Sequence, residues 1–526
     1  MDPSWVRRLF FGLAVLYVLP FWVVTYIPTT DGPCHLYNAF VLNQYENTEK
    51  YPLFQKYYEI DPRPYPNWLT HAALVLLLEL LPPLIAEKVL VSAYVLVFLG
   101  GAWYLAGAVR PEERWPAFLA FPFVYNYTFQ FGFYNFSISL GLFFFILGFW
   151  WRRRSGLDLA AAVKLNLLLW LCYFTHILSF VLALASIGVL WLATLRREAW
   201  RRHLLHVPAL VPQILLPLWF FGRQGTGTLP SSWSLDALWR YFISLEALFT
   251  FSRVQVRGAR LLVLLFLVLA ILTLRRRNVF WSGRRPRLVL QEADAFLLLA
   301  GLSALLYFFS PGGMSGGTLI KHRLSLYPYL LLIPWLAPQA RLVRTAGVAV
   351  LALLAALNLG YLVHWYRVLD GDIQRYLAGL EAVRPDSRLL PILFDKRGSA
   401  ARSAVLGHAA SYAALEKGLI DWDNYEATTR LFPVHFRPGV RILDQGIIET
   451  QPGIVPVRSY SRRVDYVYTW KMPPDVPLAH RLRNHYRLVW EKDGAALFVP
   501  RKERARSPRL LYASGPRSSE EDPPER

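Results

Sequence analysis

Long apolar runs that end in arginine clusters constrain this chain more than any other feature. Several runs approach the roughly 20 residues that a helix needs to cross a bilayer. They end in stretches such as "WWRRRSG", "LRREAWRRH" and "LRRRNVFWSGRRPR". Of all residues, 55% are hydrophobic and 18% are charged, which is below the quarter typical of soluble proteins. We therefore expect an α-helical polytopic membrane protein.

The formal charge of +21 indicates a membrane partner and no nucleic acid. Its arginines stand at the ends of apolar runs, which is typical of cytoplasmic loops. The two cysteines, Cys34 and Cys172, provide neither a disulfide framework nor a metal-ligand spacing. Arg7 and Arg8 precede the first apolar run, and no small-residue cleavage site follows it. We interpret this run as an uncleaved anchor with a cytoplasmic N-terminus.

Apolar length and the arginine positions together predict about eleven transmembrane helices, with the C-terminus outside the cytoplasm. Asn67–Pro83 resembles a further span, but counting it as one would place Arg152–Arg154 outside. We therefore interpret it as an interfacial or re-entrant helix within a long outer loop, residues 29–83. The predicted spans are about 9–28, 86–109, 115–130, 134–151, 158–175, 177–195, 206–222, 259–275, 291–309, 324–339 and 344–366.

Three parts follow from this pattern: a membrane module over 1–366, a small extracytoplasmic α/β domain over 367–500 and a disordered tail over 501–526. In the domain, "SRLLPILF" predicts a buried strand, and "ARSAVLGHAASYAALEKG" predicts a helix that ends at Gly418. "YRLVWEKDGAALFVP" predicts a hairpin around Asp493-Gly494. The tail is rich in Arg, Ser, Pro and Glu, a composition typical of disorder.

The stretch "YIPTTDGPCHLYNAF" places Asp31 just beyond the first span. An amphipathic pattern over Cys34–Tyr45 predicts a juxtamembrane helix that lies in the interface with its apolar face in lipid. His35 shares a helix face with Asp31 if the helix begins there. The pair then starts an active site at headgroup depth. Alternatively, Asp31 is only an N-cap and His35 an interfacial polar residue.

Two further outer-face features carry polar residues. "YNYTFQFGFYNF" alternates aromatic residues with Asn126, Gln130 and Asn135, which suits stacking and hydrogen bonding to a sugar, although aromatic belts are also common at interfaces. His176, in "CYFTHILSF", falls at the outer end of a predicted span. Polar residues at membrane depth are functional candidates, and the alternative is a structural helix-end histidine.

"GGMSGGTLIKHRLSLYPYLLLIPWL" places Lys321, His322 and Arg323 on the outer face, where basic residues are otherwise few. Arginine binds phosphate as a fork and lysine as a point charge. The glycine-rich stretch Gly312–Gly317 gives a flexible loop that could close over a headgroup. Snorkelling basic side chains are the alternative.

An acid, a phosphate site and polar aromatics on one face indicate sugar transfer from a polyprenyl phosphate. Such a reaction needs cations for the phosphate leaving group and a carboxylate that deprotonates the acceptor hydroxyl. We assign Asp31 as the base, with His35 beside it, and Arg323 and Lys321 as leaving-group stabilisers.

"TTDGPCHLYNA" and "KHRLSLYPYLLLIPWL" resemble motifs of the GT-C glycosyltransferases, the superfamily of protein O-mannosyltransferases and lipid A aminoarabinose transferases. The second motif is similar to an Arg-Tyr-x-Leu-Pro-x-x-Pro pattern, from which Ser325 and Tyr327 depart. The many-span body with a small outer domain is also GT-C-like. The resemblance implies inverting transfer from a polyprenyl-phosphate-linked sugar donor, at the bacterial inner membrane, to a lipid, protein or glycan acceptor.

The resemblance also implies roles for individual residues. Asp31 matches the family's outer-loop acid, which acts as a base or contacts the acceptor or a metal, and Arg323 matches the arginine that contacts the lipid phosphate. Gly32 stands where members often have a second acid, and "FQFGFYN" contains no acid. We therefore expect metal-independent transfer and name no certain cofactor and no metal ligand, while a divalent metal stays an open alternative.

Two other classes of function are compatible with the sequence. A transporter or flippase for lipid-linked glycans predicts internal repeats and ionisable residues at the midplane, of which Lys164 is the one candidate in the sequence. A non-catalytic assembly protein that binds lipid-linked sugar would need Arg323 but not Asp31.

Overall fold

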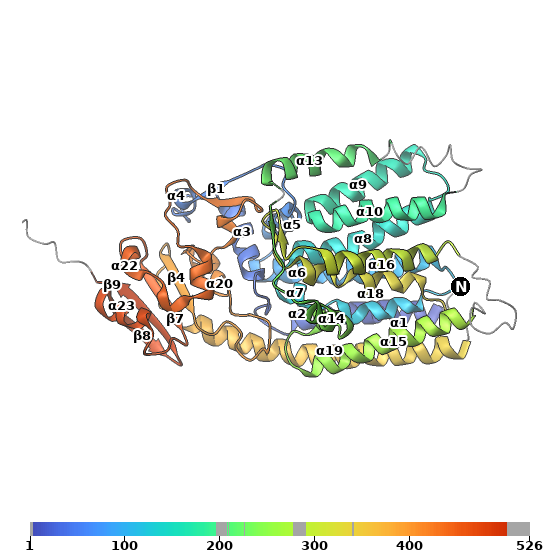
Figure 1. The fold of residues 1–526 in the computed structure, drawn as a ribbon. Helices are drawn as coiled ribbons and strands as arrows, with labels where there is room; N and C mark the ends of the chain where they lie inside the picture. Colours follow the sequence, from blue (N-terminus) through green and yellow to red (C-terminus); the bar gives the residue numbers. More distant parts are fainter. Residues whose placement is uncertain are drawn as a thin grey trace, which may run out of the picture.

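In the computed structural model, a long helical bundle carries a small sheet-containing domain at one end (Figure 1). The structure describes residues 4–195, 208, 210–225, 227–276, 291–338 and 341–501. Two predicted inner arginine clusters and the predicted tail beyond residue 501 lie outside these ranges. The N-terminal helix begins at the end of the bundle opposite the sheet domain (Figure 1).

Six helices within the described residues are long and apolar enough to cross a membrane. These apolar helices are consistent with an integral membrane protein. They are the pair α1 (Ser4–Leu16) and α2 (Leu19–Trp22), which count as one, and α6 (Pro83–Val109), α8 (Tyr134–Arg152), α10 (Ile177–Thr194), α15 (Val254–Arg276) and α19 (Arg341–Ala378).

The other five predicted spans are not confirmed as long helices. α9 (Leu159–Thr175) and α16 (Asp294–Phe309) are apolar but shorter, and α13 (Pro212–Gln224) has only 13 residues. The span predicted near 324–339 is broken into α17 (Ile320–Leu324), α18 (Tyr327–Leu332) and the 3₁₀ helix η4 (Ile333–Trp335). The span predicted at 115–130 is the 3₁₀ helix η1 (Trp115–Phe123) followed by α7 (Tyr127–Gln130). α5 (Trp68–Leu78) has eleven residues, about 16 Å, which is too short to span.

Proline explains why η1 is not an α-helix. Pro122 lies inside it and cannot donate a backbone hydrogen bond. The segment still runs beside α19, because Trp115 packs on Gly347 and the rings of Tyr125 and Tyr366 lie 5.6 Å apart. A 3₁₀ helix has a larger rise per residue than an α-helix, so the few residues of η1 extend further along α19.

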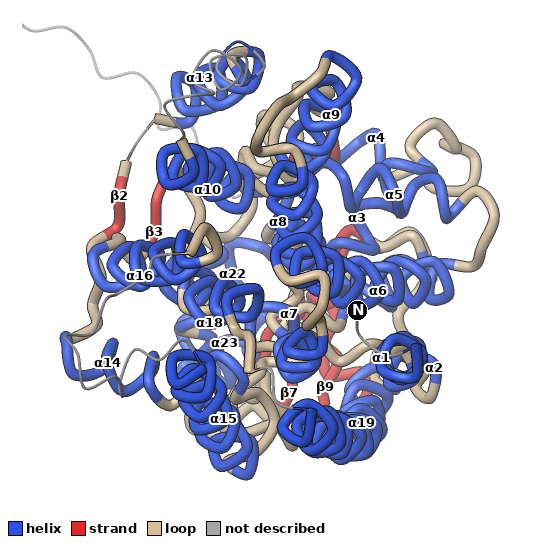
Figure 2. The backbone as a smooth tube through the Cα atoms, turned by 90° about the vertical axis from the view of Figure 1, so that its right-hand side faces the viewer, coloured by secondary structure: helices blue, strands red, loops and turns tan. Residues whose placement is uncertain are grey.

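Arginines that follow different helices meet at one end of the bundle. Arg110, after α6, donates to Gln291 (3.0 Å), and Arg154, after α8, donates to Glu292 (3.0 Å). Viewed along the bundle from its N-terminal end, these helices lie side by side (Figure 2). Arginines that the sequence places after two different helices therefore lie at the same end of the bundle.

The C-terminal domain contains a mixed five-stranded sheet in the order β5-β4-β7-β9-β8. The predicted strand, hairpin and helix end are confirmed: Asp493 and Gly494 both have positive φ, as a two-residue hairpin turn requires, and Gly418 follows the last helical residue at φ +64°. The elements are β4 (Arg388–Leu393), α20 (Ala410–Lys417), β5 (Ile420–Asp421), the 3₁₀ helix η5 (Glu426–Thr428), β6 (Val434–Phe436), α21 (Gln445–Thr450), the 3₁₀ helix η6 (Pro452–Ile454), α22 (Val457–Tyr460), β7 (Tyr466–Trp470), α23 (Pro477–His485), β8 (Tyr486–Lys492) and β9 (Ala495–Pro500).

The outer loop and the C-terminal domain are built into one another. β1 (Tyr58–Ile60) of the loop pairs with β6, and α3 (Gly32–Gln44) packs against α5 and α20. α4 (Phe54–Tyr57) precedes β1. The side-chain amides of Asn38 and Asn424 exchange two hydrogen bonds of 2.9 Å.

α3 corrects one prediction. Its start and length match the predicted juxtamembrane helix, but every residue of Gly32–Val41 is buried, so no face of this stretch lies in lipid. The polar side chains on the helix hydrogen-bond to the C-terminal domain instead of to water. Hydrophobic patterning alone does not distinguish a polar helix face that contacts water from one that packs against another domain. The polar residues recur at the same positions in both cases.

Candidate functional site

A cavity of about 440 Å³ opens between the outer loop, the helical bundle and the C-terminal domain. Five of the nine predicted site residues line it. They are Asp31, His35, Asn135, His176 and Arg323. The carboxylate and the guanidinium on which the predicted chemistry depends therefore face the same space.

Asp31 stands at the N-cap of α3, yet its side chain makes no capping hydrogen bond. Its backbone is held from behind, where its N–H donates to the carbonyl of Phe131 (3.0 Å). Gly132 permits this contact, because φ is +95° there and a Cβ would come within 2.6 Å of the Asp31 nitrogen. Burial raises the pKa of the Asp31 carboxyl to about 6, although His408 and His35 oppose the rise.

His408 connects Asp31 to a second acid. Its Nε2 lies 3.6 Å from Oδ1 of Asp31, and its Nδ1 lies 3.4 Å from Oδ2 of Asp423. Burial alone would lower the pKa of His408, but the hydrogen bond and charge of Asp423, together with the charge of Asp31, raise it to about 9. A protonated imidazole thus stands between two buried carboxylates and keeps Asp31 partly compensated.

Arg323, on α17, is 9% exposed. Its guanidinium lies over the ring of Phe133, at 4.2 Å from the centroid, and near Phe136. Within the described residues, no carboxylate or other acceptor makes a hydrogen bond or ion pair with it, and its Nε is buried without a partner. A buried cation is costly unless it is compensated, so this part of the cavity suits an anion. Lys396 of the C-terminal domain also lines the cavity.

Asn135 and His176 shape the walls through their own hydrogen bonds. The amide of Asn135 accepts from the backbone of Thr70 (3.2 Å) and donates to the carbonyl of Asn67 (3.1 Å). Nδ1 of His176 accepts from the backbone of Leu178 (3.2 Å) and caps α10. The other ring nitrogen of His176, Nε2, takes no part in this cap.

Lys321 and His322, which we predicted as phosphate ligands, lie outside the cavity lining. The ammonium of Lys321 donates to the carbonyls of Tyr307 and Phe308 (3.0 Å each), at the last turn of α16. The imidazole of His322 is enclosed by aromatic rings, with Trp233 at 5.0 Å. Both side chains are used by the protein itself, which explains basic residues on this face without a ligand.

Asn126 and Gln130, predicted to bind a sugar, also lie outside the lining. Asn126 caps α7 and donates to the carbonyl of Phe123 (2.8 Å). Nε2 of Gln130 donates to the hydroxyl of Tyr366 (2.9 Å), and the backbone carbonyl of Gln130 accepts from the backbone N–H of Thr30 (3.1 Å). These amides fold the loop that supports Asp31.

The glycine-rich stretch after α16 reaches the cavity as predicted, but as a hydrogen-bonded hairpin. β3 (Gly313–Met314) pairs with β2 (Thr228–Leu229), and Met314 and Gly317 form a further bridge. Residues 314–318 line the cavity next to α17. This hairpin forms a wall beside the guanidinium of Arg323, whose Nη1 lies 3.8 Å from a Cβ built at Gly317.

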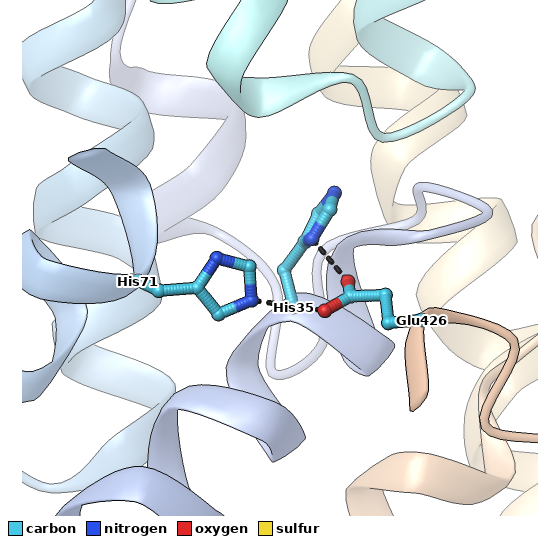
Figure 3. Close-up of side chains that lie close together, drawn as sticks. All are labelled: His35, His71 and Glu426. Atoms are coloured by element: carbon cyan, nitrogen blue, oxygen red, sulfur yellow. Dashed lines mark hydrogen bonds and ion pairs between the residues drawn. The ribbon is translucent and has the colours of Figure 1, made fainter. Parts of the chain in front are cut away.

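Beside the cavity, two imidazoles face one buried carboxylate: His35 of α3, His71 of α5 and Glu426 of η5 (Figure 3). The charges and hydrogen bonds of the two histidines outweigh burial and lower the pKa of Glu426 to about 2. One ligand atom from each residue lies within 4.8 Å of the others, so the group could hold a metal ion.

The sequence analysis missed His408, Asp423, Lys396, His71 and Glu426. A signal existed for His71, which interrupts the apolar run of Asn67–Pro83. The others belong to the C-terminal domain and come to the outer loop only by folding. Comparisons with known protein families, with curated proteins and with solved structures found no match for this chain.

Proposed function

We propose that the chain is a membrane glycosyltransferase of the GT-C type, which moves a sugar from a polyprenyl-phosphate donor to an extracytoplasmic acceptor with inversion. One observation carries the proposal: an uncompensated buried guanidinium, Arg323, and a carboxylate without a capping role, Asp31, line one cavity. The phosphate of the donor supplies an anion for Arg323. The hydroxyl of the acceptor supplies a proton for Asp31.

The reaction balances with these two groups. Asp31 takes the proton of the acceptor hydroxyl as its oxygen attacks the anomeric carbon. The bond between that carbon and the phosphate oxygen breaks on the opposite side, so the configuration inverts. The phosphate leaves with the bonding electrons, and its added charge is stabilised by Arg323. Lys396 supplies a second cation at the cavity wall, a role that Lys321 was predicted to fill.

The donor's lipid chain also finds a suitable surface. Apolar side chains of α10 and α13 form one side of the same cavity. A polyprenyl chain entering between these helices would leave its phosphate near Arg323. The apolar lining residues on the two helices are Ile177, Leu178, Val181, Phe220 and Phe221.

Orientation follows from the two ends of the bundle. The N-terminus and the arginines of the helix ends lie away from the sheet domain, and such arginines mark the cytoplasmic side. We place the cavity and the sheet domain on the extracytoplasmic side of a bacterial inner membrane. In this arrangement the shorter and broken helices also cross, which gives eleven passes.

The test is turnover by the purified chain in lipid bilayers, with a polyprenyl-phosphate sugar and a panel of lipid, protein and glycan acceptors. We expect release of polyprenyl phosphate, reduced about 10²- to 10⁴-fold in Asp31→Asn because a general base is lost. Asp61→Asn is the matched control, since Asp61 belongs to the same outer loop and pairs with Arg63 instead of lining the cavity.

Three outcomes would overturn the proposal. Equal turnover by Asp31→Asn and wild type removes the assigned base. Donor binding without turnover by any acceptor supports a binding protein for lipid-linked sugars. Movement of the intact donor between leaflets, without release of polyprenyl phosphate, supports a flippase.

A further inference from the structure

Three buried side chains from distant parts of the chain meet behind one wall of the cavity. His35 and His71 come from the outer loop, on α3 and α5, and Glu426 comes from η5 of the C-terminal domain. Their exposed fractions are 2%, 0% and 0%. Figure 3 shows both rings directed at the same carboxylate from different sides. A carboxylate is almost never fully buried unless it is paired, and here two imidazoles pair with it.

The hydrogen bonds within this cluster are incomplete. Nε2 of His71 lies 2.9 Å from Oε2 of Glu426, within hydrogen-bond distance. Nδ1 of His35 forms an ion pair with Oε1 of Glu426. Within the described residues, Nδ1 of His71 is buried without a hydrogen-bond partner. One ligand atom from each of the three side chains lies within 4.8 Å of the others, so the three residues can share one ligand.

We propose that His35, His71 and Glu426 form a binding site for a divalent metal ion of the zinc class. Two imidazole nitrogens and one carboxylate oxygen are a donor set that zinc favours, and three protein ligands leave room for a fourth. Zinc ligands at about 2.0–2.2 Å from the ion lie about 3.3 Å apart from one another. The observed spread of up to 4.8 Å needs only small side-chain movements to reach this.

Magnesium and calcium fit the cluster poorly. Both prefer six or more oxygen ligands, and this cluster offers the two oxygens of one carboxylate. The nearest described acid on α3, Asp31, faces the cavity and His408 instead. The donor chemistry therefore selects a metal that accepts nitrogen.

The ion would join three segments that carry the cavity wall. Of the three ligands, His35 alone lines the cavity, so the ion sits behind the wall and not at its centre. α3 begins just after Asp31, and η5 follows Asp423 and Tyr425 directly. Metal binding would fix these elements to each other and stabilise the junction of the outer loop with the C-terminal domain. The inference does not depend on sugar transfer.

The test uses the full chain purified in detergent with a removable tag that contains no histidine. Metal content is measured after equilibration with zinc and dialysis, and the visible absorption of a cobalt-loaded sample reports nitrogen coordination. We expect about one zinc per chain in wild type and about 10-fold less or below in His71→Gln and Glu426→Gln, because each removes a ligand. His322→Gln, which changes a buried histidine elsewhere, keeps the wild-type content.

A chelator provides a measurement that needs no variant. It should lower the unfolding temperature of wild type, because an ion that binds only the folded state stabilises it, and zinc should restore that temperature. The proposal is wrong if wild type retains no zinc or cobalt after dialysis, or if both ligand variants keep the wild-type amount. Because none of these measurements uses a sugar donor, they succeed or fail independently of the glycosyltransferase assay.

Discussion

The two charged walls of the cavity solve the problem of buried charge in opposite ways. In the carboxylate wall, Asp31, His408 and Asp423 alternate in sign, so the protein supplies each charge with a neighbour. In the arginine wall, Arg323 lies against the rings of Phe133 and Phe136, and no acid among the described residues forms a hydrogen bond or ion pair with it. In the carboxylate wall the charges are paired within the protein, while in the proposed function the bound phosphate pairs with Arg323 in the other wall.

This difference assigns the two ends of a ligand. We assign the anionic group to the arginine wall, where its charge compensates the guanidinium that burial has separated from water. The neutral reacting group belongs at the carboxylate wall, where adding another charge would disturb a balanced chain. A lipid-linked sugar phosphate and an acceptor hydroxyl meet both conditions.

The largest expected effect comes from removing the cation of the arginine wall. We expect Arg323→Met to weaken binding of polyprenyl phosphate on the order of 100-fold or more, since it deletes one partner of a buried charge pair. The same change should raise the unfolding temperature of the free protein, because an uncompensated buried charge is gone. Binding is measured by titration in detergent and unfolding by thermal melts.

Lys321→Met is the matched control for that experiment, two residues away on the same helix. It removes the donor to the carbonyls of Tyr307 and Phe308, so it should lower the unfolding temperature and leave phosphate binding unchanged. If the two variants behaved alike in binding, the distinction between a ligand cation and a structural cation would fail.

The next effect, on stability, should come from the carboxylate wall. The pKa of His408 is raised to about 9 in the folded chain, against an ordinary value near 6.5. Its protonated form therefore adds stability that is fully present below about pH 6.5 and is lost as the pH rises through about 9, which amounts to about 3 kcal/mol. Asp31, Asp423 and Glu449 are the charged groups that favour this protonated form.

The comparison with His408→Gln measures this contribution. The variant should melt below wild type at pH 6.5, and the gap should shrink toward zero by pH 10, where wild-type His408 is neutral as well. Titrating groups distant from His408 cancel in the difference, whereas Asp31, whose pKa His408 lowers, contributes to it. A gap that is constant across this range would show that His408 carries no proton between the two acids.

The smallest effect should come from Lys396, the half-buried cation on the domain side. Its exposure to solvent screens its charge, so Lys396→Met should weaken polyprenyl phosphate binding only about 5-fold, and less at high salt. Salt titration of the binding constant measures this. A loss as large as that of Arg323→Met would move the anion site from the helical bundle toward the C-terminal domain.

Sequence reasoning found those parts of the site that depend on local position. Asp31 follows an apolar run, and Arg323 stands on the outer face against the general charge pattern, and both positions can be inferred from the chain. The sequence does not indicate whether Lys321 or Arg323 faces the cavity. This depends on how α17 is rotated against α16, which is set by packing in the folded chain. Secondary structure in the sheet domain was predictable because turns such as Asp493-Gly494 are encoded locally.

The remaining parts depend on contacts between segments hundreds of residues apart. His71 and Glu426 are 355 positions apart, and no spacing rule links them. α3 looked interfacial because its polar residues had no visible partner in the sequence, while Asn424 supplies one in the fold. The spans predicted at 115–130 and 324–339 are broken for another reason: Pro122, Pro328 and Pro334 lack backbone donors that a long α-helix needs.

α19 connects the helical bundle to the sheet of the C-terminal domain. This one helix of 38 residues, about 57 Å long, starts among the bundle helices and ends beneath the sheet (Figure 1). Asp370 holds it to the backbone of Thr25 and Tyr26, just before Asp31, and Tyr376 accepts from the hydroxyl of Tyr468 in the sheet. Because α19 is hydrogen-bonded both to the backbone before Asp31 and to the sheet, it fixes the distance between the sheet and the bundle. Under the proposed function, α19 would therefore set the distance from the bundle at which an acceptor hydroxyl must reach Asp31.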